Sequence, residues 1–170
     1  MVSLNERNSW ATDPDVFVFC RGNNGRRKKL LMISRFIRIL LAEDNDGDVF
    51  LVRRALDKHI GPYQLLLAKD GEEALQVLER ANTDLNAPCP DFALLDLNLP
   101  RCGGIQILQR LRNIPRCADA PVIVFTSSDS PQDKAEAFRV GANRYFQKPT
   151  DLAGFMKLGE MVKEILPELA

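Results

Sequence analysis

Short apolar runs alternate with longer amphipathic stretches from Phe36 to the end of the chain. The apolar runs predict five β-strands, at residues 37–42, 64–68, 92–95, 122–125 and 144–147. The longer stretches carry apolar residues at helical spacing and predict five helices, at residues 49–59, 71–81, 104–113, 131–140 and 152–166. Strict alternation of strand and helix is typical of parallel sheets covered by helices. The pattern therefore predicts an α/β fold, a doubly wound five-stranded parallel sheet with helices on both faces.

The first 35 residues do not share this pattern. They mix Asn, Ser, Gly, Asp and Arg without a sustained period and contain a basic cluster at residues 26–29. We expect residues 1–35 to be a leader, either disordered or the product of a start codon placed too early, because Met32 stands just before the first strand. A nucleic-acid-binding arm is the alternative, but four basic residues make a weak electrostatic footprint. Residues 36–170 then form the folded domain.

Composition and charge exclude several classes of protein. The 170 residues hold 23 Lys and Arg against 23 Asp and Glu, so no net charge favours a nucleic acid or a membrane as partner. Four cysteines form no C-x-x-C pair and there is one histidine, which argues against a thiolate or imidazole metal site. The apolar runs are too short to cross a bilayer, and the basic cluster follows the apolar residues 16–20, the wrong order for a signal peptide. We expect a cytoplasmic protein with reduced thiols.

Polar side chains follow four of the five predicted strands at the point where each strand ends. They are Glu43 and Asp44, Asp96, Thr126 with Ser127, and Lys148. From Asp44 onward, Asp96, Thr126 and Lys148 follow at separations of 52, 30 and 22 residues, which fit two βα units followed by one and one. Each of these residues alone fits a helix cap or a solvated turn. Because ligands of open parallel sheets bind beyond the carboxyl ends of the strands, their joint spacing favours a site at one edge.

Three carboxylates, a hydroxyl and an ammonium suit phosphoryl chemistry. Acidic groups side by side repel one another, so they favour a compensating cation, and Mg²⁺ prefers hard oxygen ligands. Lys148 and Thr126 could then meet the remaining phosphoryl oxygens by charge and by hydrogen bond. Asp96 lies between the two groups and is the natural nucleophile, which would give an aspartyl-phosphate. Before phosphorylation, Lys148 would pair with Asp96.

Five sequence strings in order extend this interpretation to a family. They are ILLAEDN at 39–45, AKDGEEAL at 68–75, LLDLNLP at 94–100, VFTSS at 124–128 and GANRYFQKP at 141–149. Residues 36–167 resemble a two-component response regulator receiver domain, of the stand-alone type that resembles chemotaxis regulators. The resemblance implies a flavodoxin-like sheet with strand order 2-1-3-4-5. It also implies phosphorelay signalling with Mg²⁺ as cofactor, a sensor histidine kinase as phosphodonor and output through contact with a downstream protein.

The resemblance assigns roles residue by residue. Asp96 is the expected phosphoacceptor, and the metal ligands are Glu43, Asp44, Asp96 and the backbone carbonyl of Asn98. Lys148 and Thr126 are the expected catalytic lysine and hydroxyl, and Thr126 with Tyr145 forms the expected switch. A fixed, partly buried Tyr145 is the alternative. The Lys148–Pro149 peptide bond is expected to be cis. A receiver catalyses its own phosphorylation and dephosphorylation and is not otherwise an enzyme.

The Glu-Asp-Asn-x-x-Asp opening and the long loop before the third strand are similar to receivers paired with bacterial phytochrome kinases. About 20 residues follow Lys148, which leaves room for the last helix but not for an output domain. A phosphorylation-linked homodimer is therefore one expected output.

The loop after Asp96 departs from the family, because it contains Arg101 and Cys102. Cys102 could be an oxidant sensor, but we expect an incidental thiol. Nothing beside it in the sequence except Arg101 would lower the pKa of the thiol.

Three other interpretations compete with a phosphorylated receiver. A phosphatase of the haloacid dehalogenase type would need a second aspartate two residues after the nucleophile, where this chain has Asn98, which cannot act as an acid. A flavodoxin would cradle a phosphate after the first strand, where acidic residues would repel it. A degenerate receiver would bind partners without phosphorylation, but the complete set of site residues argues against it.

Overall fold

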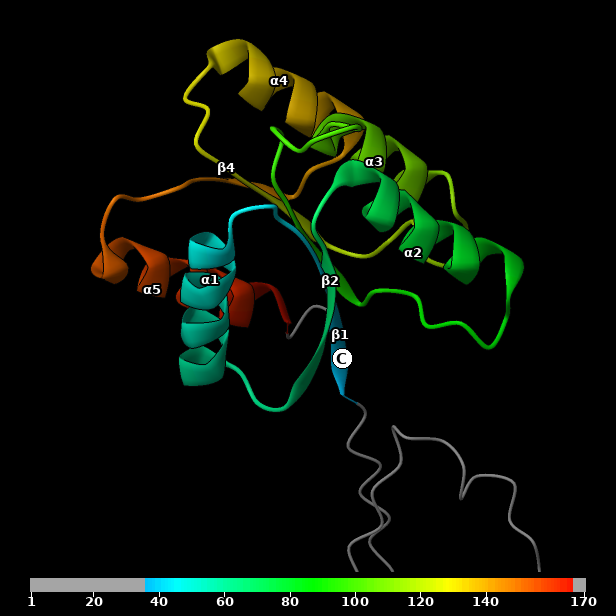
Figure 1. Ribbon diagram of the computed structural model, residues 1–170, viewed down its shortest axis with the longest axis horizontal. Helices are drawn as coiled ribbons and strands as arrows, with labels where there is room; N and C mark the ends of the chain where they lie inside the picture. The colour runs from blue at the N-terminus through cyan, green and yellow to red at the C-terminus, as the bar shows by residue number, and fades with distance from the viewer. Residues whose placement is uncertain (1–35, 167–170) are drawn as a thin grey trace, which may run out of the picture. The chain divides into compact units, whose positions relative to one another are not determined.

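The computed structural model describes residues 36–166, which form a five-stranded parallel sheet flanked by helices (Figure 1). The strands are β1 (Ile37–Ala42), β2 (Tyr63–Ala68), β3 (Phe92–Leu95), β4 (Val122–Thr126) and β5 (Arg144–Gln147). They lie in the order β2-β1-β3-β4-β5, and each neighbouring pair is parallel. The predicted fold class and strand order are therefore confirmed. The leader predicted at 1–35 lies outside the described residues.

Helices cover both faces of the sheet. They are α1 (Asp46–His59), α2 (Gly71–Thr83), α3 (Gly104–Arg112), α4 (Pro131–Val140) and α5 (Leu152–Ile165). Buried residues of α1 and α5 form one apolar cluster with one face of the sheet, and those of α2, α3 and α4 form a second cluster on the opposite face (Figure 1). Among the helices of residues 36–166, none is long and apolar enough to cross a membrane.

Local hydrogen bonds set the element boundaries. Helix α1 begins at Asp46, three residues before the predicted start, because the Asn45 side chain accepts hydrogen bonds from the backbone of Gly47 and Asp48 and caps the first turn. Helix α4 ends as predicted, since Gly141 adopts a left-handed conformation with φ 107° and caps it. The strand β4 includes Thr126, so this hydroxyl belongs to the sheet edge and not to the following loop.

Two expectations about covalent geometry are wrong. No peptide bond within residues 36–166 is cis, so Lys148–Pro149 is trans, the isomer that X–Pro bonds favour by about 0.5–1 kcal/mol. The Lys148 backbone N–H donates to the Thr126 carbonyl, and the side chain still reaches the carboxylates described below. The thiols are not all reduced, because Cys89 and Cys117 form a disulfide. They are 28 residues apart, but their loops lead into the amino ends of the neighbouring strands β3 and β4.

Candidate functional site

The carboxyl ends of β1 and β3 bring three acidic side chains together. Carboxylate oxygens of Glu43, Asp44 and Asp96 all lie within 4.8 Å of one another. The pairing of Ala42 with Leu95 sets the two strands in register, and the Asp96 N–H continues the ladder by donating to the Ala42 carbonyl. Glu43 and Asp96 are buried, whereas Asp44 is exposed. The sequence-predicted acids thus converge on one edge of the sheet.

Lys148 extends from the end of β5 into this acidic group. Its Nζ atom lies 2.6 Å from Asp96 Oδ2, 2.7 Å from Glu43 Oε2 and 3.0 Å from Asp48 Oδ2, and its side chain is only 11% exposed. Burial works against the charged form of Lys148, but the hydrogen bonds that its ammonium donates to the three carboxylates outweigh burial and raise the pKa of Lys148. The lysine is therefore a fixed positive charge beside Asp96.

Asp48 is a partner of Lys148 that sequence reasoning missed. The residue lies in the first turn of α1, where an acidic side chain is usually read as a favourable neighbour of the helix N-terminus. The available signal was the Glu-Asp-Asn-x-x-Asp string, whose last residue is Asp48. Because Asn45 starts α1 immediately after β1, the first turn of the helix stands over the acidic group.

The acidic group carries more negative charge than Lys148 can neutralise. Four carboxylates lie at the carboxyl ends of the strands, and the ammonium of Lys148 lies among them. The carboxylates belong to Glu43, Asp44, Asp48 and Asp96. Burial raises the pKa of Glu43, while its hydrogen bond and charge interaction with Lys148 oppose the rise. A cation added to hard oxygen donors would relieve this repulsion, so the residues present fit a divalent metal ion.

The two oxygens of Asp96 have different partners. Oδ2 accepts from Lys148, while Oδ1 accepts from the backbone N–H of Asn98 at 3.0 Å. The Asn98 side-chain amide in turn donates to Thr126 Oγ1 at 3.5 Å. Thr126 is fully buried at the end of β4. The carboxylate of Asp96 is thus held between the lysine on one side and the Asn98 loop on the other.

Ser128 connects Thr126 to Tyr145, and sequence reasoning overlooked it in favour of the exposed Ser127. The Ser128 backbone N–H donates to Thr126 Oγ1 at 3.3 Å, and its carbonyl accepts from the Tyr145 hydroxyl at 2.9 Å. The ring of Tyr145 is partly buried and packs against the apolar cluster beneath α4. The signal for Ser128 was its place two residues after Thr126, but the contact needs the turn that follows β4.

Comparison with known proteins gives this site its context. The protein-family model of the response regulator receiver domain matches residues 39–159. The chain belongs to the response regulator receiver family. Response regulator Rcp1 of Synechocystis sp. is 32% identical to this receiver over 120 residues, which cover 71% of this chain and 82% of Rcp1. Protein PilH of Pseudomonas aeruginosa is 28% identical over 120 residues, which cover 71% and 92% of the two chains.

Solved structures agree with this assignment. The phosphorylated cyanobacterial phytochrome response regulator RcpA matches with a TM-score of 0.70 and 30% identity, over 79% of this receiver and 96% of RcpA. The Mn²⁺-bound form of Rcp1 matches with a TM-score of 0.64 and 32% identity, over 75% and 90% of the two chains. Members of the family act in two-component phosphorelay signalling with sensor histidine kinases, and they are signalling domains and not classical enzymes.

The loop after Asp96 in this receiver is fixed to the start of α2. Arg101 adopts a left-handed conformation with φ 67°, and its guanidinium pairs with Asp70 at 3.3 Å and Glu72 at 2.9 Å. The Gly71 N–H donates to the Pro100 carbonyl. Burial, and then the charge of Glu72, raise the pKa of the Cys102 thiol, so the thiolate needed for oxidant sensing is disfavoured. Arg101, at which this loop departs from the usual sequence of the family, thus anchors the loop to the start of α2.

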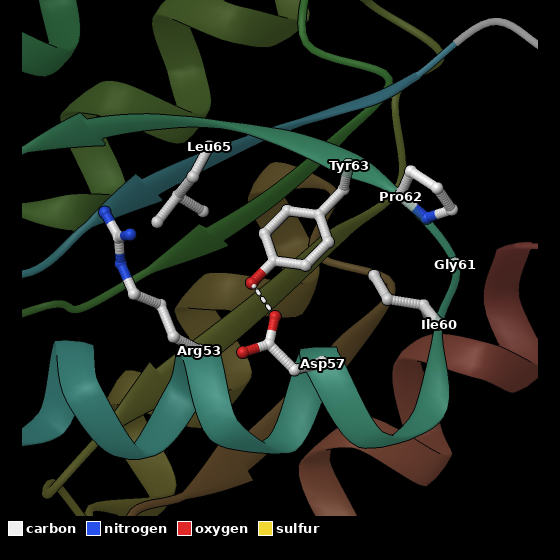
Figure 2. A pocket seen from close by; sticks show the side chains of 7 residues that line it. All are labelled: Arg53, Asp57, Ile60, Gly61, Pro62, Tyr63 and Leu65. Carbon is white, nitrogen blue, oxygen red and sulfur yellow. Dashed lines mark hydrogen bonds between the residues drawn. The ribbon is translucent and has the colours of Figure 1, made fainter.

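A separate hollow of about 640 Å³ lies between α1 and β2 and is not part of the acidic edge (Figure 2). Its lining residues are Arg53, Asp57, Ile60, Gly61, Pro62, Tyr63 and Leu65. The Tyr63 hydroxyl donates to Asp57 at 2.9 Å across it. Burial and this hydrogen bond raise the pKa of Tyr63 to about 12. The lining residues and the residues grouped around Asp96 are different sets, so the hollow is not part of that site.

Proposed function

We propose that this protein is a single-domain response regulator that accepts a phosphoryl group on Asp96 from a sensor histidine kinase. The observation that carries the proposal is the environment of Asp96. The residue is only 4% exposed, one of its carboxylate oxygens is 2.6 Å from Lys148 Nζ, and Glu43 and Asp44 lie beside it. The match over 82% of Rcp1 and 96% of RcpA supports a regulator of that size.

The transfer step uses Asp96 as a nucleophile. A carboxylate oxygen of Asp96 attacks the phosphorus of a phosphohistidine on the kinase, so an O–P bond forms while the P–N bond breaks. The electron pair of that bond returns to the imidazole nitrogen, and a proton from solvent completes the neutral histidine that leaves. Lys148 remains charged throughout, because its pKa is raised, and its ammonium balances the negative charge on the phosphoryl oxygens.

The acidic group would hold Mg²⁺ through Glu43, Asp44, Asp96 and the backbone carbonyl of Asn98. When bound, the ion supplies positive charge that offsets the phosphoryl oxygens and the neighbouring carboxylates. The surplus of carboxylates over ammonium groups supports this ligand set. The Mn²⁺-bound form of Rcp1 is a related protein with a divalent ion.

The similarity to phytochrome response regulators also supports a kind of kinase and a kind of output. RcpA is a phytochrome response regulator, and a further match at 28% identity is a regulator in red light signaling of R. palustris. These relatives favour a phytochrome-type histidine kinase as the donor. Output then passes by protein contact, to a downstream protein or to a second copy of this chain, through a surface controlled by Thr126 and Tyr145. The phosphatase and flavodoxin alternatives do not fit membership of the receiver family.

Phosphorylation with a small phosphodonor and Mg²⁺ tests the proposal directly. We expect the full chain to gain one phosphoryl group that is labile in base, and Asp96→Asn to gain none, because the amide is not a nucleophile of this kind. Asp119→Asn, which removes an exposed carboxylate at the opposite edge of the sheet, should be phosphorylated like the parent. Intact mass measures both. An unmodified parent would indicate a degenerate receiver, and a modified Asp96→Asn would place the acceptor elsewhere.

A further inference from the structure

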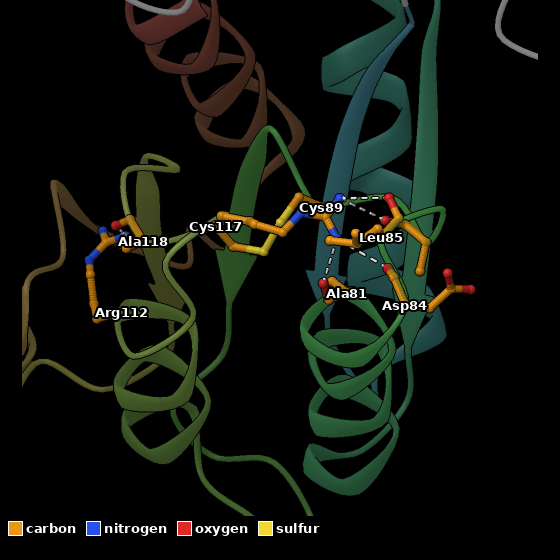
Figure 3. The surroundings of a disulfide bond; sticks show 9 residues. Ala81, Asp84, Leu85, Cys89, Arg112, Cys117 and Ala118 are labelled. Atoms are coloured by element: carbon orange, nitrogen blue, oxygen red, sulfur yellow. Dashed lines mark hydrogen bonds between the residues drawn. A yellow bond between two sulfur atoms is a disulfide. The ribbon is translucent and has the colours of Figure 1, made fainter.

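The disulfide lies at the amino ends of strands β3 and β4, whereas the acidic group lies at the carboxyl ends of the strands. Figure 3 shows the surroundings of the bond. Cys89 belongs to the connector that leads from α2 to β3, and Cys117 to the connector that leads from α3 to β4. Because both connectors enter the amino ends of neighbouring strands, the two Cα atoms are 5.7 Å apart. Cys117 is 1% exposed, whereas Cys89 is partly exposed. A reagent from solution would therefore reach the bond from the Cys89 side.

Contacts other than the disulfide fix the two connectors: Arg116 joins one to the other, and Arg112 holds the connector of Cys117 in place. The guanidinium of Arg116, the residue before Cys117, donates to four backbone carbonyls at the end of α2 and in the loop beyond it, those of Ala81, Asp84, Leu85 and Ala87, at 2.8–3.3 Å. On the other side, Arg112 donates to the carbonyls of Ala118 and Ala120 at 2.7 Å. Five of these six acceptors lie outside regular elements, so the arginines fix loop backbone that would otherwise be free to move. The thiols should remain adjacent after the bond is broken.

We propose that Cys89 and Cys117 form a reversible thiol–disulfide site that exchanges with a glutathione-type couple while the domain stays folded. In reduction, a glutathione thiolate attacks Cys89 Sγ, the S–S bond breaks, and Cys117 leaves as a thiolate that takes up a proton. A second glutathione attacks the mixed disulfide and releases the Cys89 thiol, so two glutathione molecules become one oxidised glutathione. Oxidation reverses these steps: Cys117 attacks the mixed disulfide on Cys89 and closes the bond.

The redox state changes stability without entering the phosphorylation site. The bond closes a loop between residues 28 positions apart, so its reduction should lower the Tm by on the order of 10 °C. The third described cysteine, Cys102, follows β3 at the opposite edge, and its thiol contacts Gln106, so it is not placed to exchange with the pair. We therefore expect both redox forms to retain the acidic group intact.

Alkylation and intact mass test the site in the full chain carrying Cys20→Ser and Cys102→Ser, so that the pair alone supplies thiols. In native buffer, stepping the ratio of reduced to oxidised glutathione should shift the protein between two and no alkylated thiols, in both directions. The circular dichroism spectrum should stay native. Loss of native structure on reduction would overturn the proposal, as would a bond that glutathione opens only in urea or thiols that oxidised glutathione leaves open.

Four substitutions test the shared anchor of the connectors and the unequal exposure of the two cysteines. Arg116→Ala should slow closure of the bond several-fold, because the connectors lose their shared anchor, whereas Arg139→Ala on α4 should not. Cys117→Ser should leave Cys89 able to form a mixed disulfide with glutathione, whereas Cys89→Ser should leave the buried Cys117 protected. Equal closure rates in the two arginine variants, or equal glutathionylation of the two single-cysteine variants, would contradict the proposed geometry.

Discussion

Lys148 is the residue whose position determines the electrostatics of the acidic edge. Its Nζ atom contacts three carboxylates within 3.0 Å, including the two buried ones of Glu43 and Asp96. Removal of a partner from a buried ion pair is strongly destabilising, since it leaves an uncompensated charge. Asp44 differs from the buried acids, because it is exposed and can be replaced without breaking such a pair. It is therefore the residue through which metal binding can be separated from folding.

We predict that Asp44→Ala weakens Mg²⁺ binding by about tenfold or more, because a carboxylate ligand is lost. The apo protein should melt at the same temperature as the parent or slightly higher, since like-charge repulsion with Glu43 and Asp96 is relieved. Calorimetric titration and thermal melting measure the two effects. Asp46→Ala is the control, because Asp46 is two residues away but pairs with Lys69 outside the acidic group. Unchanged Mg²⁺ affinity in Asp44→Ala would remove Asp44 from the ligand set.

At the scale of elements, the fold requires the loop after Asp96 to pack closely against the start of α2. A Cβ atom on Gly71 would lie 2.0 Å from the carbonyl oxygen of Cys102, and this neighbour is backbone that cannot turn away. The same loop is held by the ion pairs of Arg101 with Asp70 and Glu72. Because Asp96 and Asn98 lie at the base of this loop, its position also sets the geometry of the site.

Gly71→Ala should therefore lower the free energy of unfolding by about 1–3 kcal/mol, the usual cost of forcing extra atoms into packed structure. Gly61→Ala is a matched control, since a Cβ atom at Gly61 has no neighbour within 4 Å. That variant should be neutral or about 0.4–1 kcal/mol more stable, because alanine restricts the unfolded chain. Urea unfolding measures both. Similar stability of the two variants would show that the Cys102 loop moves aside easily.

The elements themselves could be predicted well because each is coded locally. The bounds of β1, β3, β5 and α4 agree with the predicted ranges, since apolar runs and the Gly141 cap mark them directly. The start of α1 differs because an Asn45 cap admits polar residues into the first turn, where hydrophobic periodicity gives no signal. Similarly, β4 takes in Thr126, a polar residue that an apolar run does not reveal.

At the scale of the whole molecule, the topology explains which parts of the site the sequence could reveal. Glu43, Asp96 and Lys148 each follow a strand, so parallel order alone brings them to one edge. Asp48 and Ser128 join through a helix turn and a loop, and the Cys89–Cys117 bond joins two connectors. Such contacts depend on the exact path of the chain in space and leave no periodic signal in the sequence.

Hydrogen bonds join Thr126 to Tyr145 through Ser128. Thr126 Oγ1 accepts from the Ser128 N–H, and the Ser128 carbonyl accepts from the Tyr145 hydroxyl, so one residue bonds to both members of the predicted switch. A phosphoryl oxygen on Asp96 would offer the Thr126 hydroxyl a new acceptor. Movement of Thr126 toward it would weaken its bond to Ser128 and shift the population of Tyr145 positions.

We predict that Thr126→Ala still accepts phosphate but loses most of the phosphorylation-dependent change in self-association or partner affinity, because the hydroxyl that senses the phosphoryl group is gone. Thr126→Ser keeps the hydroxyl and should retain the coupling, which separates this effect from general loss of stability. Alanine also leaves the Ser128 N–H without its acceptor, at a cost of about 1 kcal/mol, so all variants are compared well below their melting temperatures. Sedimentation with and without phosphodonor measures self-association. Full coupling in Thr126→Ala would mean that the phosphate reaches the surface around Tyr145 by another route.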